Sequence, residues 1–262
     1  MLLHHTETLA LTTTMKIFDS HFHIIDFNYP IVENNGYTPP EFTSEDYKKT
    51  RDEFGITGGA VVSGSFQAFD QTYLMDSLDN LGENFFGVAN IPNDISNTEI
   101  EQLSLKNVTA VRFNLKRGGS ESINHLEYLS NKLKNEFGWH TEFYLDSKDL
   151  KDLNSQLIKI KTFSIDHLGL SNEGLKDLYY WVEKGVKVKA TGFGRVNFDP
   201  IEVMKQIHRI NPNALMFGTD LPSTRAKIPF SSTDIKRITE NFSNDDQELI
   251  FYENALEWYR KK

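Results

Sequence analysis

The feature that most constrains the fold is an alternation of short apolar runs with longer amphipathic segments along most of the chain. The runs predict buried strands and the segments between them predict helices, repeating at intervals of roughly 25 to 40 residues. The expected strands are 16–19, 59–63, 85–90, 108–114, 139–145, 162–167, 186–190 and 215–219. Eight such units in 262 residues predict an α/β fold, a single (β/α)8 TIM barrel with an extra C-terminal helix.

Capping signals and glycines place the helices between these strands. Thr43 precedes a helix that ends at Gly55, and Asp199 with Pro200 opens another. The other helices are expected at 70–81, 95–105, 120–137, from 147 onward, and at 173–184, 233–241 and 245–259. A loop over 24–42 is long enough to suggest a functional role or disorder. No linker divides the chain, so residues 15–262 are expected to form one domain, preceded by a loose extension over 1–14.

Composition and charge exclude several classes of protein. The chain has no cysteine, which rules out disulfides and thiolate zinc sites, and it contains 39% hydrophobic and 25% charged residues. Its net charge of -9 argues against a nucleic-acid partner but allows an anionic substrate in a cleft lined by arginines. No apolar run is long enough to span a membrane, and 1–14 lacks signal-peptide features. We expect a cytoplasmic protein acting on a small molecule, with its oligomeric state open and a homodimer among the options.

Two histidines follow the first predicted strand with one residue between them. His21 and His23 directly follow Asp19 and Ser20, and residues i and i+2 of a strand point to the same face. Two adjacent imidazoles can hold one metal ion or face one anion. A surface pair or a hydrogen-bonded core pair has the same spacing, so the pattern needs support from other strands.

That support comes from polar residues at the predicted C-terminal ends of the strands, which share one rim in a barrel. They are His21, His23, Arg112, Asn114, Lys116, Arg117, His140, Glu142, Tyr144, Asp166, His167, Lys187, Lys189, Arg195 and Asp220. A carboxylate near histidines can act as a general base, arginines can grip a carboxylate, and a histidine can polarise a carbonyl. Their coincidence at one rim predicts an active site there.

Several of these residues also have a purely structural interpretation. Arg112 can form an ion pair with Glu142 or Asp166 instead of binding substrate. His140 lies early in its strand, which favours a packed core position. Lys187 and Lys189 alternate with valines, so their face of the strand can point to solvent.

The ordered motifs resemble a known family. They are Asp-Ser-His-Phe-His at 19–23, Val-Arg-Phe-Asn at 111–114, Gly-Trp-His at 138–140, Asp-His-Leu-Gly at 166–169, Gly-Phe-Gly-Arg at 192–195 and Gly-Thr-Asp-Leu-Pro at 218–222. Together with Tyr144, Lys189 and the Asn-Ala-Leu at 254–256, this set resembles the amidohydrolase superfamily, in its branch called amidohydrolase family 2. Within that branch it is similar to the 2-pyrone-4,6-dicarboxylate lactonases and related sugar and muconolactone lactonases.

The resemblance implies a role for each matched residue. Catalytic roles fall on Asp220 as the base that activates water, and on His21, His23 and His167. Substrate-binding roles fall on Arg112, Arg117, Tyr144, Lys189 and Arg195. The same three histidines and Asp220 would bind a metal, and the expectation is either no cofactor or one divalent ion, with zinc first. A binuclear centre is not expected, because Arg112 stands where a bridging carboxylated lysine would be needed.

The implied activity is hydrolysis of a lactone of a small carboxylated or sugar acid. The dicarboxylate lactonases carry an arginine shortly after the histidine of strand six, whereas this chain has Leu168-Gly169-Leu170. A monoanionic or sugar-type lactone is therefore expected. Two alternatives remain at this point: a metal-dependent amide hydrolase or non-oxidative decarboxylase on the same scaffold, and a non-catalytic barrel that binds small acids.

Overall fold

Eight parallel strands hydrogen-bond to one another in the order of the sequence. A computed structural model describes residues 15–160 and 162–260, so the expected extension over 1–14 lies outside the described residues. The strands are β1 (Ile17–Phe22), β2 (Ile56–Val62), β3 (Phe85–Ala89), β4 (Val108–Asn114), β5 (His140–Tyr144), β6 (Phe163–Ile165), β7 (Lys187–Ala190) and β8 (Leu215–Phe217). This order and parallel sense confirm the predicted TIM barrel.

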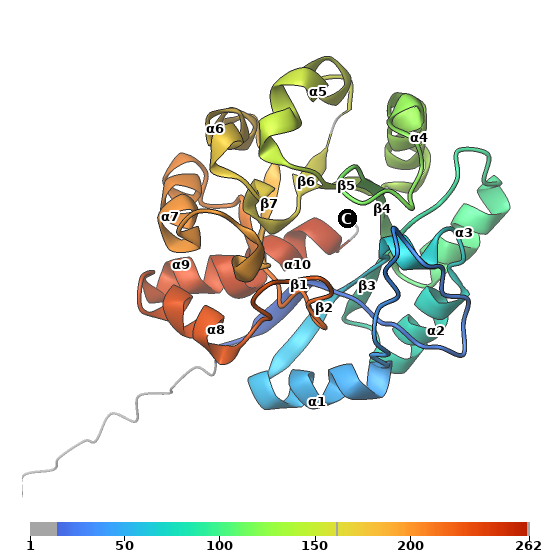
Figure 1. Ribbon diagram of the computed structural model, residues 1–262, viewed down its shortest axis with the longest axis horizontal. Helices are drawn as coiled ribbons and strands as arrows, with labels where there is room; N and C mark the ends of the chain where they lie inside the picture. The colour runs from blue at the N-terminus through green and yellow to red at the C-terminus, as the bar shows by residue number, and fades with distance from the viewer. Residues whose placement is uncertain (1–14, 161, 261–262) are drawn as a thin grey trace, which may run out of the picture.

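Helices surround the strands, as the view in Figure 1 shows. They are α1 (Ser44–Phe54), α2 (Thr72–Leu81), α3 (Asn97–Leu105), α4 (Leu126–Lys132), α5 (Leu150–Leu157), α6 (Leu175–Glu183), α7 (Pro200–Ile210), α8 (Ser232–Thr239), α9 (Asn244–Glu248) and α10 (Asn254–Tyr259). Local chemistry fixes their starts, because Thr43 and Ser96 form capping boxes with Asp46 and Glu99. No helix within the described ranges is both long and apolar enough to cross a membrane.

The barrel closes at its C-terminal rim, where the chain leaving β8 meets the end of β1. The amide of Asp220 donates to the carbonyl of His21 at 2.7 Å, and the amide of His23 donates to the carbonyl of Leu221 at 2.7 Å. The first and last strands therefore meet at their carboxyl ends. This is the region where the sequence predicts an active site.

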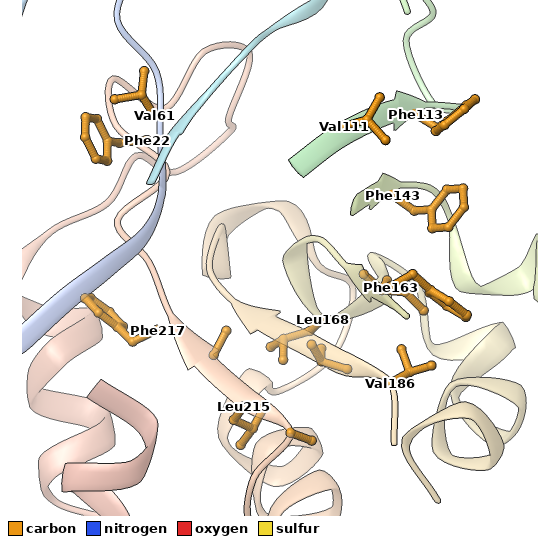
Figure 2. Close-up of a cluster of buried hydrophobic side chains, with 14 of the residues drawn as sticks. Phe22, Val61, Val111, Phe113, Phe143, Phe163, Leu168, Val186, Leu215 and Phe217 are labelled. Carbon is orange, nitrogen blue, oxygen red and sulfur yellow. The ribbon is translucent and has the colours of Figure 1, made fainter. Parts of the chain in front are cut away.

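Two apolar layers hold this rim in place. The outer layer lies between strands and helices and includes Phe22, Val111, Phe143 and Phe217 (Figure 2). The inner layer fills the lower barrel, where Tyr259 of α10 stacks on Phe18 with ring centroids 5.5 Å apart. The predicted C-terminal helix thus packs against the interior of the barrel and supports the charged residues above it.

Two segments differ from the sequence prediction. Strand β1 continues to Phe22 instead of ending at residue 19, so both site histidines are part of the strand or its edge. The helix expected over 120–137 begins later, at Leu126, and ends in a wider π-helical turn over Leu133–Phe137. Ser122 explains the late start, because its side chain caps a separate short turn by accepting from the amide of Asn124.

Candidate active site

An irregularity in β1 turns His21 toward the barrel interior. Asp19 pairs with Gly59 but Phe22 pairs with Val61, so β1 has one residue more than β2 over this stretch. The extra residue lets the imidazoles of His21 and His23 meet edge to face, with ring centroids 5.1 Å apart. Phe22 points outward and stacks on Tyr47 of α1. The two histidines therefore owe their shared orientation to a bulge as well as to their spacing.

Asp19 fastens β1 to the end of β8 beside these histidines. Its carboxylate accepts from the amide and hydroxyl of Thr219 at 2.8 and 2.7 Å, and from the hydroxyl of Tyr47 at 3.1 Å. Burial raises the pKa of Asp19 to about 6, although these hydrogen bonds oppose the shift. Sequence reasoning gave Asp19 no role. The only sequence signal for one was its position as the first residue of the motif that contains His21 and His23.

Asp220 lies at the centre of three imidazoles. Its Oδ1 is 3.9 Å from Nε2 of His21, 4.0 Å from Nε2 of His23 and 3.9 Å from Nε2 of His167. All four side chains are buried, and Oδ1 of Asp220 has no hydrogen-bond partner among the residues that the structure describes. The structure thus brings together the four residues for which catalytic roles were expected.

The backbone that presents Asp220 and His167 is strained. Asp220 has a φ of +61° and His167 a φ of +52°, a left-handed conformation that is costly for residues other than glycine. Arg195 fixes the Asp220 carboxylate by donating from Nε to Oδ2 at 2.6 Å. One carboxylate oxygen is therefore anchored while the other faces the imidazoles.

The three imidazoles are neutral bases at neutral pH. Burial lowers the pKa of His21 below its ordinary value and lowers the pKa of His23 and His167 well below it. Nδ1 of His23 lies 2.7 Å from the carbonyl oxygen of Val62 and must donate to it, so its Nε2 presents a lone pair to Asp220. Nδ1 of His167 lies 2.8 Å from the hydroxyl of Thr191.

A cluster of buried charges lies beneath this centre. Arg112 donates to Asp166 Oδ2 from Nε at 3.2 Å and from Nη2 at 2.8 Å. Lys189 forms an ion pair with Glu142, and its Nζ lies 3.7 Å from Asp166 Oδ1 and 3.4 Å from Nδ1 of His21. Arg112 therefore does form the structural ion pair with Asp166, and Lys189 points into the barrel, not to solvent.

These contacts keep both carboxylates ionised. Burial raises the pKa of Glu142, but the charge of Lys189 and the hydrogen bond to His140 hold that pKa at about 2. Burial likewise opposes the shift at Asp166, whose pKa is held well below its ordinary value by His21, Lys189 and Arg112. His140 is a core residue that hydrogen-bonds to Glu142 at 2.9 Å. We call Arg112, Glu142, Asp166 and Lys189 the buried charge cluster.

An open pocket lies above Asp220, with about 390 Å³ of empty volume when the open solvent at its mouth is included. Among the residues with expected substrate roles, Arg112, Arg117, Tyr144 and Arg195 line it, whereas Lys189 does not. Sequence reasoning missed six of the remaining lining residues, which are Tyr37, Gly64, Ser65, Phe66, Thr224 and Arg225. The only sequence signal for Tyr37 was the length of the 24–42 loop. The only signal for Arg225 was its position three residues after the motif at 218–222.

The donor set fits a single divalent ion. His21, His167 and Asp220 each offer a ligand atom within 4.8 Å of the other two, and Nε2 of His21 is buried without a partner. Two ligands bound to one tetrahedral zinc lie roughly 3.4 Å apart, so separations near 3.9 Å would have to contract by about half an ångström. Such an ion would polarise a carbonyl and lower the pKa of a bound water.

A (β/α)8 barrel that brings a carboxylate between imidazoles at its C-terminal rim has the layout of a TIM-barrel enzyme, whose active site lies at the ends of the strands. The chain belongs to the amidohydrolase family, since the family model Amidohydro_2, described as amidohydrolase, matches residues 18–261.

Individual relatives agree with this assignment. A 4-sulfomuconolactone hydrolase from Hydrogenophaga intermedia is 24% identical over 245 residues, covering 84% of this chain and 78% of the relative. The crystal structure of a probable 2-pyrone-4,6-dicarboxylic acid hydrolase from Acinetobacter baumannii, with citric acid bound, has a TM-score of 0.78 at 22% identity and covers 93% and 98% of the two chains. A zinc-bound amidohydrolase from Burkholderia multivorans has a TM-score of 0.66 at 11% identity, covering 93% of this chain and 98% of its own.

Proposed function

We propose that this protein hydrolyses a lactone of a small carboxylated or sugar acid. The observation that carries the proposal is Asp220 Oδ1, which is buried, free of hydrogen bonds and 3.9 to 4.0 Å from three imidazole nitrogens at the base of an arginine-lined pocket. The relatives described as lactone hydrolases support the same reaction class.

Asp220 acts as the general base in this proposal. Its Oδ1 takes a proton from water as the water oxygen attacks the lactone carbonyl, and the carbonyl π electrons move to oxygen. The intermediate then expels its ring oxygen, which receives the proton from Asp220, so the ester opens to a hydroxy acid. The neutral imidazoles of His21, His23 and His167 surround the reacting carbon. Nε2 of His21 or His167 hydrogen-bonds to the developing oxyanion where it carries the proton, whereas His23, whose Nδ1 proton goes to the Val62 carbonyl, can only accept a hydrogen bond there.

The residues assigned to substrate binding divide into two groups. Arg117 and Tyr144 face the pocket and contact the anionic part of the substrate directly, while Arg195 combines pocket lining with its bond to Asp220. Lys189 lies below the pocket and acts through His21 and Glu142, so we reassign it from substrate binding to positioning.

At most one divalent ion takes part, and we expect turnover without it. Lys189 already lies beside His21, and Arg195 is bonded to Asp220, so a metal would enter next to two cations. If purified protein contains zinc that is lost together with activity on chelation, the alternative of metal-dependent amide hydrolysis, which the donor set also allows, is favoured.

The test is hydrolysis of a panel of carboxylated and sugar lactones by wild type and by Asp220→Asn. We expect the substitution to lower kcat by roughly 10²- to 10⁴-fold, because proton transfer to a positioned base contributes about that much. Asp245→Asn, at an exposed acid in the first turn of α9, is the control and should keep full activity. Unchanged turnover in Asp220→Asn would refute the base assignment. Binding of small acids without any turnover would favour the non-catalytic alternative.

A further inference from the structure

Two of the four arginines in the pocket have no carboxylate partner. Arg112 is paired with Asp166 and Arg195 with Asp220. Within residues 15–160 and 162–260, neither Arg117 nor Arg225 forms an ion pair. Both are only partly exposed, so the pocket carries positive charge that the surrounding chain does not neutralise.

A tight turn in the 24–42 loop connects the backbone of Arg117 with the side chain of Arg225 beside the pocket. Asn34 and Tyr37 exchange backbone hydrogen bonds at 3.0 and 3.1 Å. The Asn34 side chain donates to the carbonyl of Arg117 at 3.1 Å and accepts from Nη1 of Arg225 at 3.2 Å, so one residue links the loops after β4 and β8. The guanidinium of Arg225 also lies over the Tyr37 ring, 4.3 Å from its centroid.

Arg225 belongs to the same turn as Asp220, the proposed general base. Asp220, Ser223 and Arg225 all have positive φ values, +61°, +62° and +58°, and the amide of Ser223 donates to the carbonyl of Asp220 at 2.6 Å. Three left-handed residues in six positions are costly and mark a conformation that its surroundings hold in place. The turn therefore sets a fixed spacing between the base and the Arg225 side chain.

Placing two cations together has a cost that an anion would remove. Burial lowers the pKa of Arg225, and the nearby charge of Arg117 lowers it further. A carboxylate or sulfonate between the guanidinium groups would accept charge-assisted hydrogen bonds from both and relieve this repulsion.

We propose that Arg225 and Arg117 together bind one anionic group on the part of the substrate remote from the scissile carbonyl, and that Asn34 positions Arg225 for this. The inference rests on the proposed function and narrows its substrate class to lactones that carry a carboxylate or sulfonate away from the reacting ester. It also agrees with a monoanionic substrate, since the two arginines without a carboxylate partner serve a single group.

The experiment compares 5-oxotetrahydrofuran-2-carboxylate with its neutral carboxamide as substrates. We expect Arg225→Ala to raise KM for the carboxylate by roughly 10- to 100-fold with kcat nearly unchanged, since hydrogen bonds to charged groups are worth about that much. The carboxamide should be a poor substrate of wild type, and Arg225→Ala should leave the KM for the carboxamide unchanged. Arg225→Lys should recover only part of the loss, because it keeps the charge without the guanidinium fork. Lys227→Ala, an exposed cation in the same loop that does not line the pocket, should behave as wild type.

Calorimetric titration with citrate separates this inference from the proposed activity. If wild type binds citrate, Arg225→Ala binds it at least about tenfold more weakly, and no lactone is hydrolysed, the anion site stands and the lactonase proposal fails. Equal citrate affinity in wild type and Arg225→Ala would overturn the inference even in an active lactonase. The same holds if wild type binds no citrate, or if it hydrolyses the carboxamide as efficiently as the carboxylate.

Discussion

The charges beneath the active site and those at its mouth are arranged in opposite ways. In the buried charge cluster, Arg112 and Lys189 each contact a carboxylate that comes from the strand two places away in the barrel or from its end. At the mouth, Arg117 and Arg225 contact no carboxylate in the described part of the chain. Both regions contain arginine or lysine at the end of a barrel segment, so residue type alone does not separate them.

The difference shows what each set of charges is for. A buried charge that its neighbours fully compensate holds those neighbours in place, and removing one partner leaves another charge unpaired. A partly exposed cation without a carboxylate partner can neutralise an anionic ligand. By this criterion we propose that the lower cluster orients His21, whereas the arginines at the mouth select the substrate.

The largest effect should come from breaking the buried charge cluster. We expect Lys189→Met to lower the free energy of unfolding by about 3–5 kcal/mol, because Glu142 would lose its cation in a fully buried site. Urea denaturation followed by circular dichroism measures the change. Lys187→Met, two residues earlier on β7 and half-buried, is the matched control and should cost less than about 1.5 kcal/mol.

A second variant tests the cause of this loss. Lys189→Met combined with Glu142→Gln removes the unpaired carboxylate as well as the cation, so it should be more stable than Lys189→Met alone. If the double variant is less stable than the single one, or if Lys189→Met unfolds like wild type, the charges in the cluster do not depend on each other.

A smaller effect of a different kind is expected at the mouth. Arg117→Ala should change the free energy of unfolding by less than about 0.5 kcal/mol, since its side chain forms no ion pair or hydrogen bond within residues 15–160 and 162–260. It should raise KM for a carboxylated lactone by roughly tenfold or more, because a charge-assisted contact is lost. Lys116→Ala, in the same turn but paired with Asp146, should leave KM unchanged. A loss of stability with unchanged KM would instead place Arg117 with the structural charges.

The same contrast explains which parts of the fold and of the candidate site could be predicted from the sequence. The strand order and the gathering of His21, His23, His167 and Asp220 follow from local apolar runs and from the rule that parallel strands end at one rim. The burial of Lys189 could not be read from β7, because it depends on Glu142 and Asp166 from two other strands.

Irregular segments limited the prediction in another way. Arg225 and Tyr37 lie in loops without periodicity, yet their side chains are in contact. Arg225 also bonds to Asn34, which is 191 residues away in the sequence. The extra residue in β1 arises from its pairing with β2 and leaves no signal in the order of residues 19–22. What the sequence misses here is long-range contact.

The smallest expected effect separates the two regions within a single protein sample. The Debye length falls from about 10 Å at 0.1 M salt to about 3 Å at 1 M, so salt screens partly exposed arginines but hardly reaches side chains with no exposed surface. Raising NaCl from 0.05 to 0.5 M should therefore increase KM for a carboxylated lactone about two- to fivefold. The neutral carboxamide should show no such change, and kcat should stay constant because Asp220 and the imidazoles are buried. If salt increases KM equally for both substrates, the arginines at the mouth do not act on the charge of the substrate.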